Sequence, residues 1–136
     1  MEERFLLFKA AGEGFAFRLQ EISEVMEPQP VFPIPRAPGH FLGLINFHGT
    51  LSALVDLPLF LGRAGRRRPG KLLVLDTKAA HLALGVDGVH SIIPREAVSG
   101  EAPGEDPLTA ALIETGHGTF RLLQLEALLF CLEQGL

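Results

Sequence analysis

The sequence predicts an all-β protein made of two small, similar lobes that share one hydrophobic core. Short apolar runs of strand length recur along the chain, and glycine, proline and charged residues separate them. The apolar pattern of the first half returns in the second half at a shift of 67 residues. Five prolines between residues 28 and 38 exclude a helix from that segment. Short helical turns and a short C-terminal helix complete the prediction.

The composition is that of one domain with a sizeable core. The chain has 136 residues, and 47% of them are hydrophobic. A net charge of −4 argues against a general nucleic-acid-binding protein. No apolar run approaches the roughly 20 residues that span a bilayer, and the opening MEER lacks a signal-peptide pattern. We therefore expect a cytoplasmic protein with no direct membrane insertion.

The first half is expected to begin with strands over residues 5–8 and 15–19, joined by the turn AAGEG. Alternation then buries Phe15 and Phe17 on one face and turns Ala16 and Arg18 to the other. Residues 20–26 are predicted to form a turn that leads into another strand.

The next apolar runs, FLGLINF (41–47) and TLSALVDL (50–57), flank His48 and Gly49. Because glycine permits a positive φ, this pair predicts a hairpin turn between two strands. The following LPLFLG predicts one helical turn that ends at Gly62.

The internal repeat predicts the second half. At a shift of 67, residues 5–8 fall on residues 72–75 and residues 15–17 fall on residues 82–84. At a shift of 69, residues 48–50 fall on residues 117–119. We therefore expect two pseudo-repeated lobes, approximately 1–67 and 68–136, of about five strands each. Lobes this small rarely fold alone, so they should share a core.

Two further segments are predicted from their composition. Residues 94–108 are rich in proline, glycine and acid, which favours a mobile loop. Leu125, Leu128, Leu129 and Leu132 have the spacing of a helix that docks one face on the core. Cys131, the only cysteine, cannot form an internal disulfide and is expected to be buried on this helix.

The residues that carry chemistry lack the spacing of a catalytic, metal or phosphate site. The five histidines show no H-x-x-x-H pattern, and glycine-rich phosphate loops are missing from the sequence. Asp56 and Asp87 each follow a valine at a strand end, where we expect them to accept backbone N–H bonds. The sequence thus predicts no catalytic residues, no metal and no cofactor, and hence no enzyme.

A basic cluster interrupts the otherwise acidic chain at Arg63, Arg66, Arg67, Arg68 and Lys71. We interpret it as a solvated linker. A contact with an acidic partner is the alternative, because such clusters steer association.

Residues 41–57 resemble the central motif of the CheW-like family, the coupling proteins of bacterial chemotaxis. The matching positions are Gly43, Asn46, Gly49, Val55, Asp56 and Leu57. The first hairpin with ISEVME, the proline-rich VFPIPRAPGHFLG and the segment LALGVDGVHSIIP resemble other blocks of the family in the same order. Two positions differ: His48 stands where the family usually has arginine, and Ala53 or Leu54 where it usually has proline.

The resemblance implies two five-stranded, SH3-like β-barrels joined by a hydrophobic interface in a single CheW-like domain over residues 1–136. It also implies a non-catalytic adaptor of a two-component signal-transduction system. Its implied partners are the regulatory domain of a CheA-type histidine kinase and the cytoplasmic tip of a methyl-accepting chemoreceptor. Carried over residue by residue, the partner-binding positions are Glu24, Asn46, His48 and Gly49. Val86 and Val89 are candidates for lining a groove, with core packing as the favoured alternative.

Three alternatives stay open on the sequence alone. The chain could be a diverged CheW-like module that serves another motility or signalling system, because His48 replaces arginine. It could be a small-molecule-binding or catalytic double barrel that uses Asp56 or His48. It could also be a regulatory module cut from a larger fusion protein.

Overall fold

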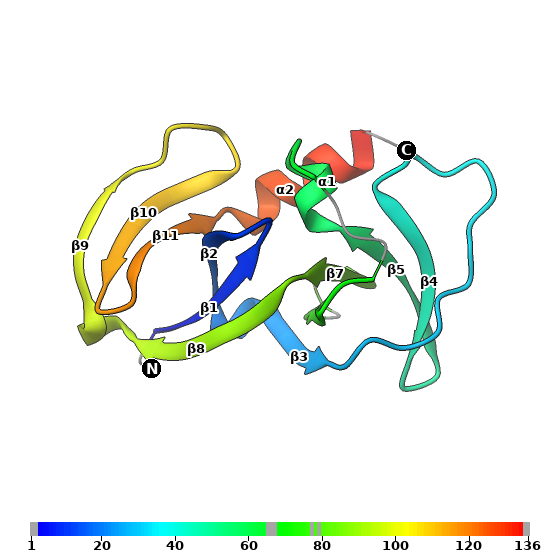
Figure 1. Cartoon of the computed structure of the whole chain (residues 1–136), viewed down its shortest axis with the longest axis horizontal. Helices are drawn as coiled ribbons and strands as arrows, with labels where there is room; N and C mark the ends of the chain where they lie inside the picture. Colours follow the sequence, from blue (N-terminus) through cyan, green and yellow to red (C-terminus); the bar gives the residue numbers. More distant parts are fainter. Residues whose placement is uncertain (1–2, 65–67, 77, 79, 135–136) are drawn as a thin grey trace.

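The fold is taken from a computed structural model that describes residues 3–64, 68–76, 78 and 80–134 (Figure 1). Two β-sheets lie at opposite ends of the long axis, and two short helices lie between them on one side (Figure 1). The strands are β1 (Arg4–Ala10), β2 (Glu13–Arg18), β3 (Ile22–Met26), β4 (Phe41–Phe47), β5 (Thr50–Asp56), β6 (Lys71–Leu75), β7 (Leu82–Val86), β8 (Gly88–Pro94), β9 (Val98–Pro103), β10 (Thr109–Thr115) and β11 (Gly118–Leu123). The helices are α1 (Leu57–Phe60) and α2 (Leu125–Gln134), with 3-10 turns at Leu19–Glu21 and Arg95–Ala97.

One sheet has six strands in the order β8-β1-β2-β11-β10-β9, and the other has five in the order β3-β6-β7-β5-β4. Most neighbours are antiparallel, but β2 pairs with β11 and β5 pairs with β7 in parallel. The all-β prediction is confirmed. The barrel prediction is not, because these pairings form two open sheets whose edge strands are β8, β9, β3 and β4.

The sheets are not divided near residue 67, where the sequence predicted the lobe boundary. The N-terminal hairpin β1–β2 lies in the sheet of β8–β11, whereas β6 and β7 lie in the sheet of β3–β5. Strands that the repeat aligns hold the same places in the two sheets: β8-β1-β2-β11-β10 runs in the same order as β3-β6-β7-β5-β4. Each half of the chain thus gives its first hairpin to the other half's sheet. The division of the chain into two pseudo-repeated lobes stays a prediction.

The core consists of one central cluster and two outer ones. The central cluster combines buried side chains from both sheets and both helices, including Phe8, Phe17, Leu84 and Leu128. One outer cluster lies within the six-stranded sheet and the other within the five-stranded sheet. Central strands are therefore buried on both faces, which explains their near-continuous apolar sequence.

Burial on both faces corrects one prediction for β2. Phe15 and Phe17 pack in the central cluster, as expected, but Ala16 on the opposite face is also fully buried, in the outer cluster with Phe5 and Phe120. Alternation predicted the direction of each side chain correctly. It did not predict that a second cluster covers the other face.

The predicted loop over residues 94–108 is partly wrong. Val98–Pro103 form β9, which pairs antiparallel with β10, for example Leu112 with Ala102. Most β9 side chains are exposed, because the strand is an edge of the sheet. Backbone pairing alone defines such a strand, so apolar alternation gave no signal for it.

The predicted helical elements form as expected. Asp56 caps α1, its Oδ1 accepting from the Leu59 N–H at 3.3 Å, and the helical turn ends at Gly62 with a φ of +80°. Leu125, Leu128 and Leu132 of α2 are buried. Cys131 was predicted to be buried but is exposed, because it lies beside the helix face that these leucines form and not within it. Among the described helices, none has the length and apolar character to cross a membrane.

Asp56→Ala should lower the free energy of unfolding by about 1–2 kcal/mol, because it removes a cap acceptor in a buried setting. Asp56→Asn is the matched control, since it keeps a cap oxygen and should lose less. Urea denaturation of the three proteins measures the difference. An Ala variant as stable as the wild type would show that Asp56 is not a structural cap.

Glu21→Gln should stabilise the protein at pH 7. The Oε1 atom of Glu21 is buried without a hydrogen-bond partner among the described residues, and burial raises the pKa of this carboxyl. A raised pKa favours folding while the group is protonated, and that benefit is lost as the pH rises through the folded-state pKa. The advantage of glutamine should therefore shrink as the pH falls through the raised folded-state pKa, and it should be absent below the ordinary glutamate pKa of about 4.3. Urea unfolding at pH 7 and pH 4 tests this, and an equal advantage at both values would contradict it.

Candidate functional site

The tip of the β4–β5 hairpin is a two-residue turn. Phe47 and Thr50 pair across it, and His48 and Gly49 form the turn with φ values of +50° and +84°. Positive φ at both central residues matches the right-handed twist of a hairpin. The Gly49 N–H donates to Asn46 Oδ1 at 2.8 Å, so Asn46 caps the turn. Space around Gly49 is open, which makes the backbone conformation its only local requirement.

Glu24 of β3 meets this tip although it lies far away in the sequence. Its Oε1 is 3.3 Å from His48 Nε2, and both side chains are accessible, with relative exposures of 43% and 72%. The contact is an ion pair only when the imidazole is protonated. Glu24, Asn46, His48 and Gly49 are therefore neighbours at one exposed end of the five-stranded sheet.

This site joins the two edges of an open sheet. β3 and β4 lie at opposite ends of the strand order, yet the Glu24–His48 contact connects them. A second link runs from Gln29 Nε2, just after β3, to the Asn46 carbonyl oxygen at 2.9 Å. The sheet thus curls until its edges approach, and side chains hold the seam at this end.

Exposed apolar residues lie on the strands that carry the polar group or pair with those strands. Leu51 of β5, the strand partner of Asn46, is 59% exposed, and Phe32 and Val25 are also exposed. Phe32 forms two backbone hydrogen bonds with Leu44 of β4, at 2.7 and 2.8 Å. Sequence reasoning missed these apolar neighbours. Leu51 is exposed while the adjacent Ser52 is buried, so polarity at these two positions is the reverse of the usual pattern.

Val86 and Val89 do not join this surface. Val86 is only 1% exposed and packs in the central cluster, and Val89 is partly buried against the same cluster. Their packing supports the core role that the sequence analysis favoured over groove lining.

The acidic residues considered for catalysis have structural contacts. Asp56 caps α1, and Asp87 Oδ2 accepts from the Gly12 N–H at 2.9 Å, which holds the β1–β2 turn. The expectation that both carboxylates accept backbone N–H bonds is confirmed. His40 lies between two phenylalanine rings, and burial lowers its pKa. Among the described residues, no group of three or more His, Cys, Asp or Glu side chains is arranged to hold a metal ion.

The basic cluster is described only in part. Arg63 pairs with Glu13 and Lys71 pairs with Glu27, so these two cations have partners within the chain. Arg68 is exposed, and Arg66 and Arg67 lie outside the described residues.

Comparison with known proteins agrees with this architecture. The curated chemotaxis protein CheW of Rhizobium meliloti (strain 1021) is 27% identical over 90 residues, which cover 65% of this chain and 58% of that protein. The match thus spans less than two thirds of the relative. The crystal structure of the scaffolding protein TtCheW from Thermoanaerobacter tengcongensis is similar in fold, with a TM-score of 0.77 at 20% identity over 91% of this chain and 90% of that one. A family model, the CheW-like domain, matches residues 4–130. The matched range includes every strand and most of α2, and the chain therefore belongs to the CheW-like domain family.

Proposed function

We propose that this protein is a non-catalytic adaptor of bacterial chemotaxis that acts in the cytoplasm. Its partners are the regulatory domain of a CheA-type histidine kinase and the cytoplasmic tip of a methyl-accepting chemoreceptor. By binding differently to the two signalling states of a receptor, it couples receptor state to kinase activity. Family membership supports the general role, and the partners are what that membership leads us to expect.

The observation that carries the proposal is the contact between Glu24 and His48 at the exposed hairpin tip. It gathers the four polar positions expected to bind partners, from two edges of one sheet, on a surface with exposed apolar side chains. Polar groups beside accessible apolar residues are suited to a protein partner. The outer cluster of the five-stranded sheet contacts this surface through Phe47, whose ring centroid lies 4.4 Å from that of His48.

His48 also favours a second candidate function, a related adaptor in another motility or signalling system. Arginine carries a permanent charge and a planar set of five donors, whereas histidine changes its charge between about pH 5 and 8. A partner carboxylate that binds arginine in a bidentate manner would be held less well by His48. This second function would require a kinase or receptor whose binding surface accommodates histidine in place of arginine.

Calorimetric titration with the regulatory domain of the CheA-type kinase from the same organism tests the main proposal. We expect a Kd in the micromolar range, and a parallel titration with a receptor-tip fragment should also show binding. A Leu51→Asp variant should weaken binding at least about tenfold if the hairpin tip is the contact surface. Lack of binding to every such kinase domain of that cell would refute the kinase-coupling role.

His48→Arg should bind the kinase domain or receptor tip about two- to fivefold more tightly at pH 8, because an exposed ion pair contributes up to about 1 kcal/mol. The wild type should bind more tightly at pH 6 than at pH 8, since protonation restores the positive charge, while the arginine variant should bind equally well at both. His81→Arg is the matched control, because it makes the same change at another exposed histidine. Equal affinities of wild type and His48→Arg from pH 6 to 8 would rule out a role for this charge.

A further inference from the structure

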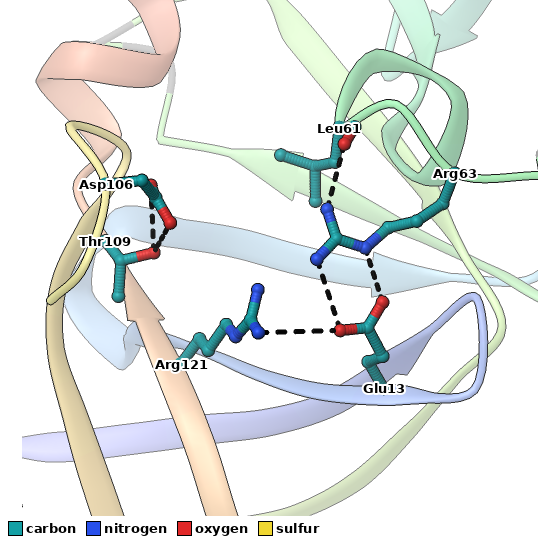
Figure 2. A network of polar contacts seen from close by, with 6 residues as sticks. All are labelled: Glu13, Leu61, Arg63, Asp106, Thr109 and Arg121. Atoms are coloured by element: carbon teal, nitrogen blue, oxygen red, sulfur yellow. Dashed lines mark hydrogen bonds and ion pairs between the residues drawn. The ribbon is translucent and has the colours of Figure 1, made fainter.

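Two adjoining cavities form a cleft away from the hairpin tip. Their volumes are about 340 and 330 Å³, and both are lined by Asp106, Thr109 and Arg121. The walls come from the start of β2, from β11, from the loop between β9 and β10, and from the segment after α1 (Figure 2). The cleft therefore lies where the two sheets meet, a common location for small-molecule sites.

The cationic wall of the cleft consists of Arg63 and Arg121. Arg63 donates through Nη2 to Glu13 Oε1 at 3.2 Å, through Nε to Glu13 Oε2, and through Nη1 to the Leu61 carbonyl oxygen at 2.8 Å (Figure 2). The hydrogen bond from Arg63 lowers the pKa of Glu13, so this carboxylate is ionised and already engaged.

The N–H donors of the Arg121 guanidinium are not engaged in hydrogen bonds with other described residues. Its Nη2 lies 3.9 Å from Glu13 Oε1, beyond hydrogen-bond distance. The side chain is 38% exposed and faces both cavities. A guanidinium has five N–H donors in a planar arrangement that suits a carboxylate.

The opposite wall is acidic. Asp106 and Glu105 lie in the loop before β10, and Asp106 Oδ1 accepts from the Leu108 N–H at 2.9 Å. Thr109 Oγ1 donates to both Asp106 oxygens at 3.0–3.1 Å, which fixes the orientation of the carboxylate. An ionised carboxylate has roughly four acceptor positions, so one remains for a ligand.

Apolar residues complete the cleft. Phe15, Phe60, Leu108 and Leu123 line one cavity, and Leu112 lines the other. A bare carboxylate would meet repulsion from Glu105 and Asp106, and a bare amine would meet repulsion from the two arginines. A zwitterion satisfies both walls, and an apolar side chain matches the remaining surface.

We propose that this cleft binds a small zwitterion of the α-amino-acid type that carries an apolar side chain. The ligand carboxylate bonds to Arg121, its ammonium group faces Asp106 and Glu105, and its side chain packs against Phe60 and Leu108, which are only partly buried. The site uses none of the residues of the hairpin tip, so it goes beyond the adaptor function and its failure would leave that function untouched.

The test is a titration of the full ¹⁵N-labelled chain with leucine, methionine and phenylalanine, followed by amide chemical shifts. We expect saturable shifts at Gly14, Leu112 and Thr119 for at least one amino acid, with a Kd below about 10 mM. 4-Methylpentanoate and 3-methylbutylamine, which each retain one charge of leucine, should bind at least about tenfold more weakly than leucine, or than the tightest amino acid. If all three amino acids fail to saturate these shifts, or if a single-charge analogue binds equally well, the proposal is overturned.

Arg121→Gln should abolish the saturable shifts, and Arg4→Gln, which removes an exposed arginine of β1 outside the cleft, should leave them unchanged. Arg121→Lys keeps the charge but loses the planar donors, and it should weaken binding several-fold while preserving the fold. Thermal unfolding of each variant verifies folding. Undiminished binding by either folded Arg121 variant would overturn the assignment.

Discussion

The parallel pairing of β2 with β11 is the constraint on which the architecture depends. Only two residue pairs, Arg121 with Phe15 and Leu122 with Ala16, define its register. Together with the antiparallel pairing of β1 with β8, they insert the N-terminal hairpin between strands of the C-terminal half. The pairing of β5 with β7 does the same in the other sheet. Neither half can complete a sheet alone, because each needs the other's hairpin. The central cluster, with side chains from both sheets and both helices, follows directly from this exchange.

The same exchange explains where the two candidate sites lie. Each sheet remains open, so its edges must be held by other means, and at the β4–β5 tip Glu24 and His48 form that link. Where the sheets meet, Arg63 after α1 reaches across to Glu13 at the start of β2. At both sites, polar side chains link segments whose remaining contacts are mostly apolar. The polar residues that make these links are accessible at the surface, so a partner or a ligand can reach them.

Sequence patterns predicted the secondary-structure elements that are determined by residues close together in the sequence. Alternation and Gly49 predicted the β4–β5 hairpin, and leucine spacing predicted α2. The sequence did not predict β9, because its strand geometry comes from pairing with β10 and not from its own side chains. Asn46, His48 and Gly49 are neighbours in the sequence, whereas only the family resemblance grouped Glu24 with them. The contact between Glu24 and His48 was not predicted, because it forms only when the sheet brings its two edges together. Arg63 and Glu13, 50 residues apart, gave no sequence signal.

His48 illustrates how a fold can leave an exposed turn residue free to change. The turn requires a positive φ at positions 48 and 49, and Asn46 and Gly49 satisfy its hydrogen bonding without the imidazole. The Glu24–His48 pair is largely exposed, and exposed ion pairs contribute between about 0 and 1 kcal/mol to stability. Replacement of the family's usual arginine therefore hardly affects folding. Its consequence falls on the charge that the hairpin tip presents to the proposed partner.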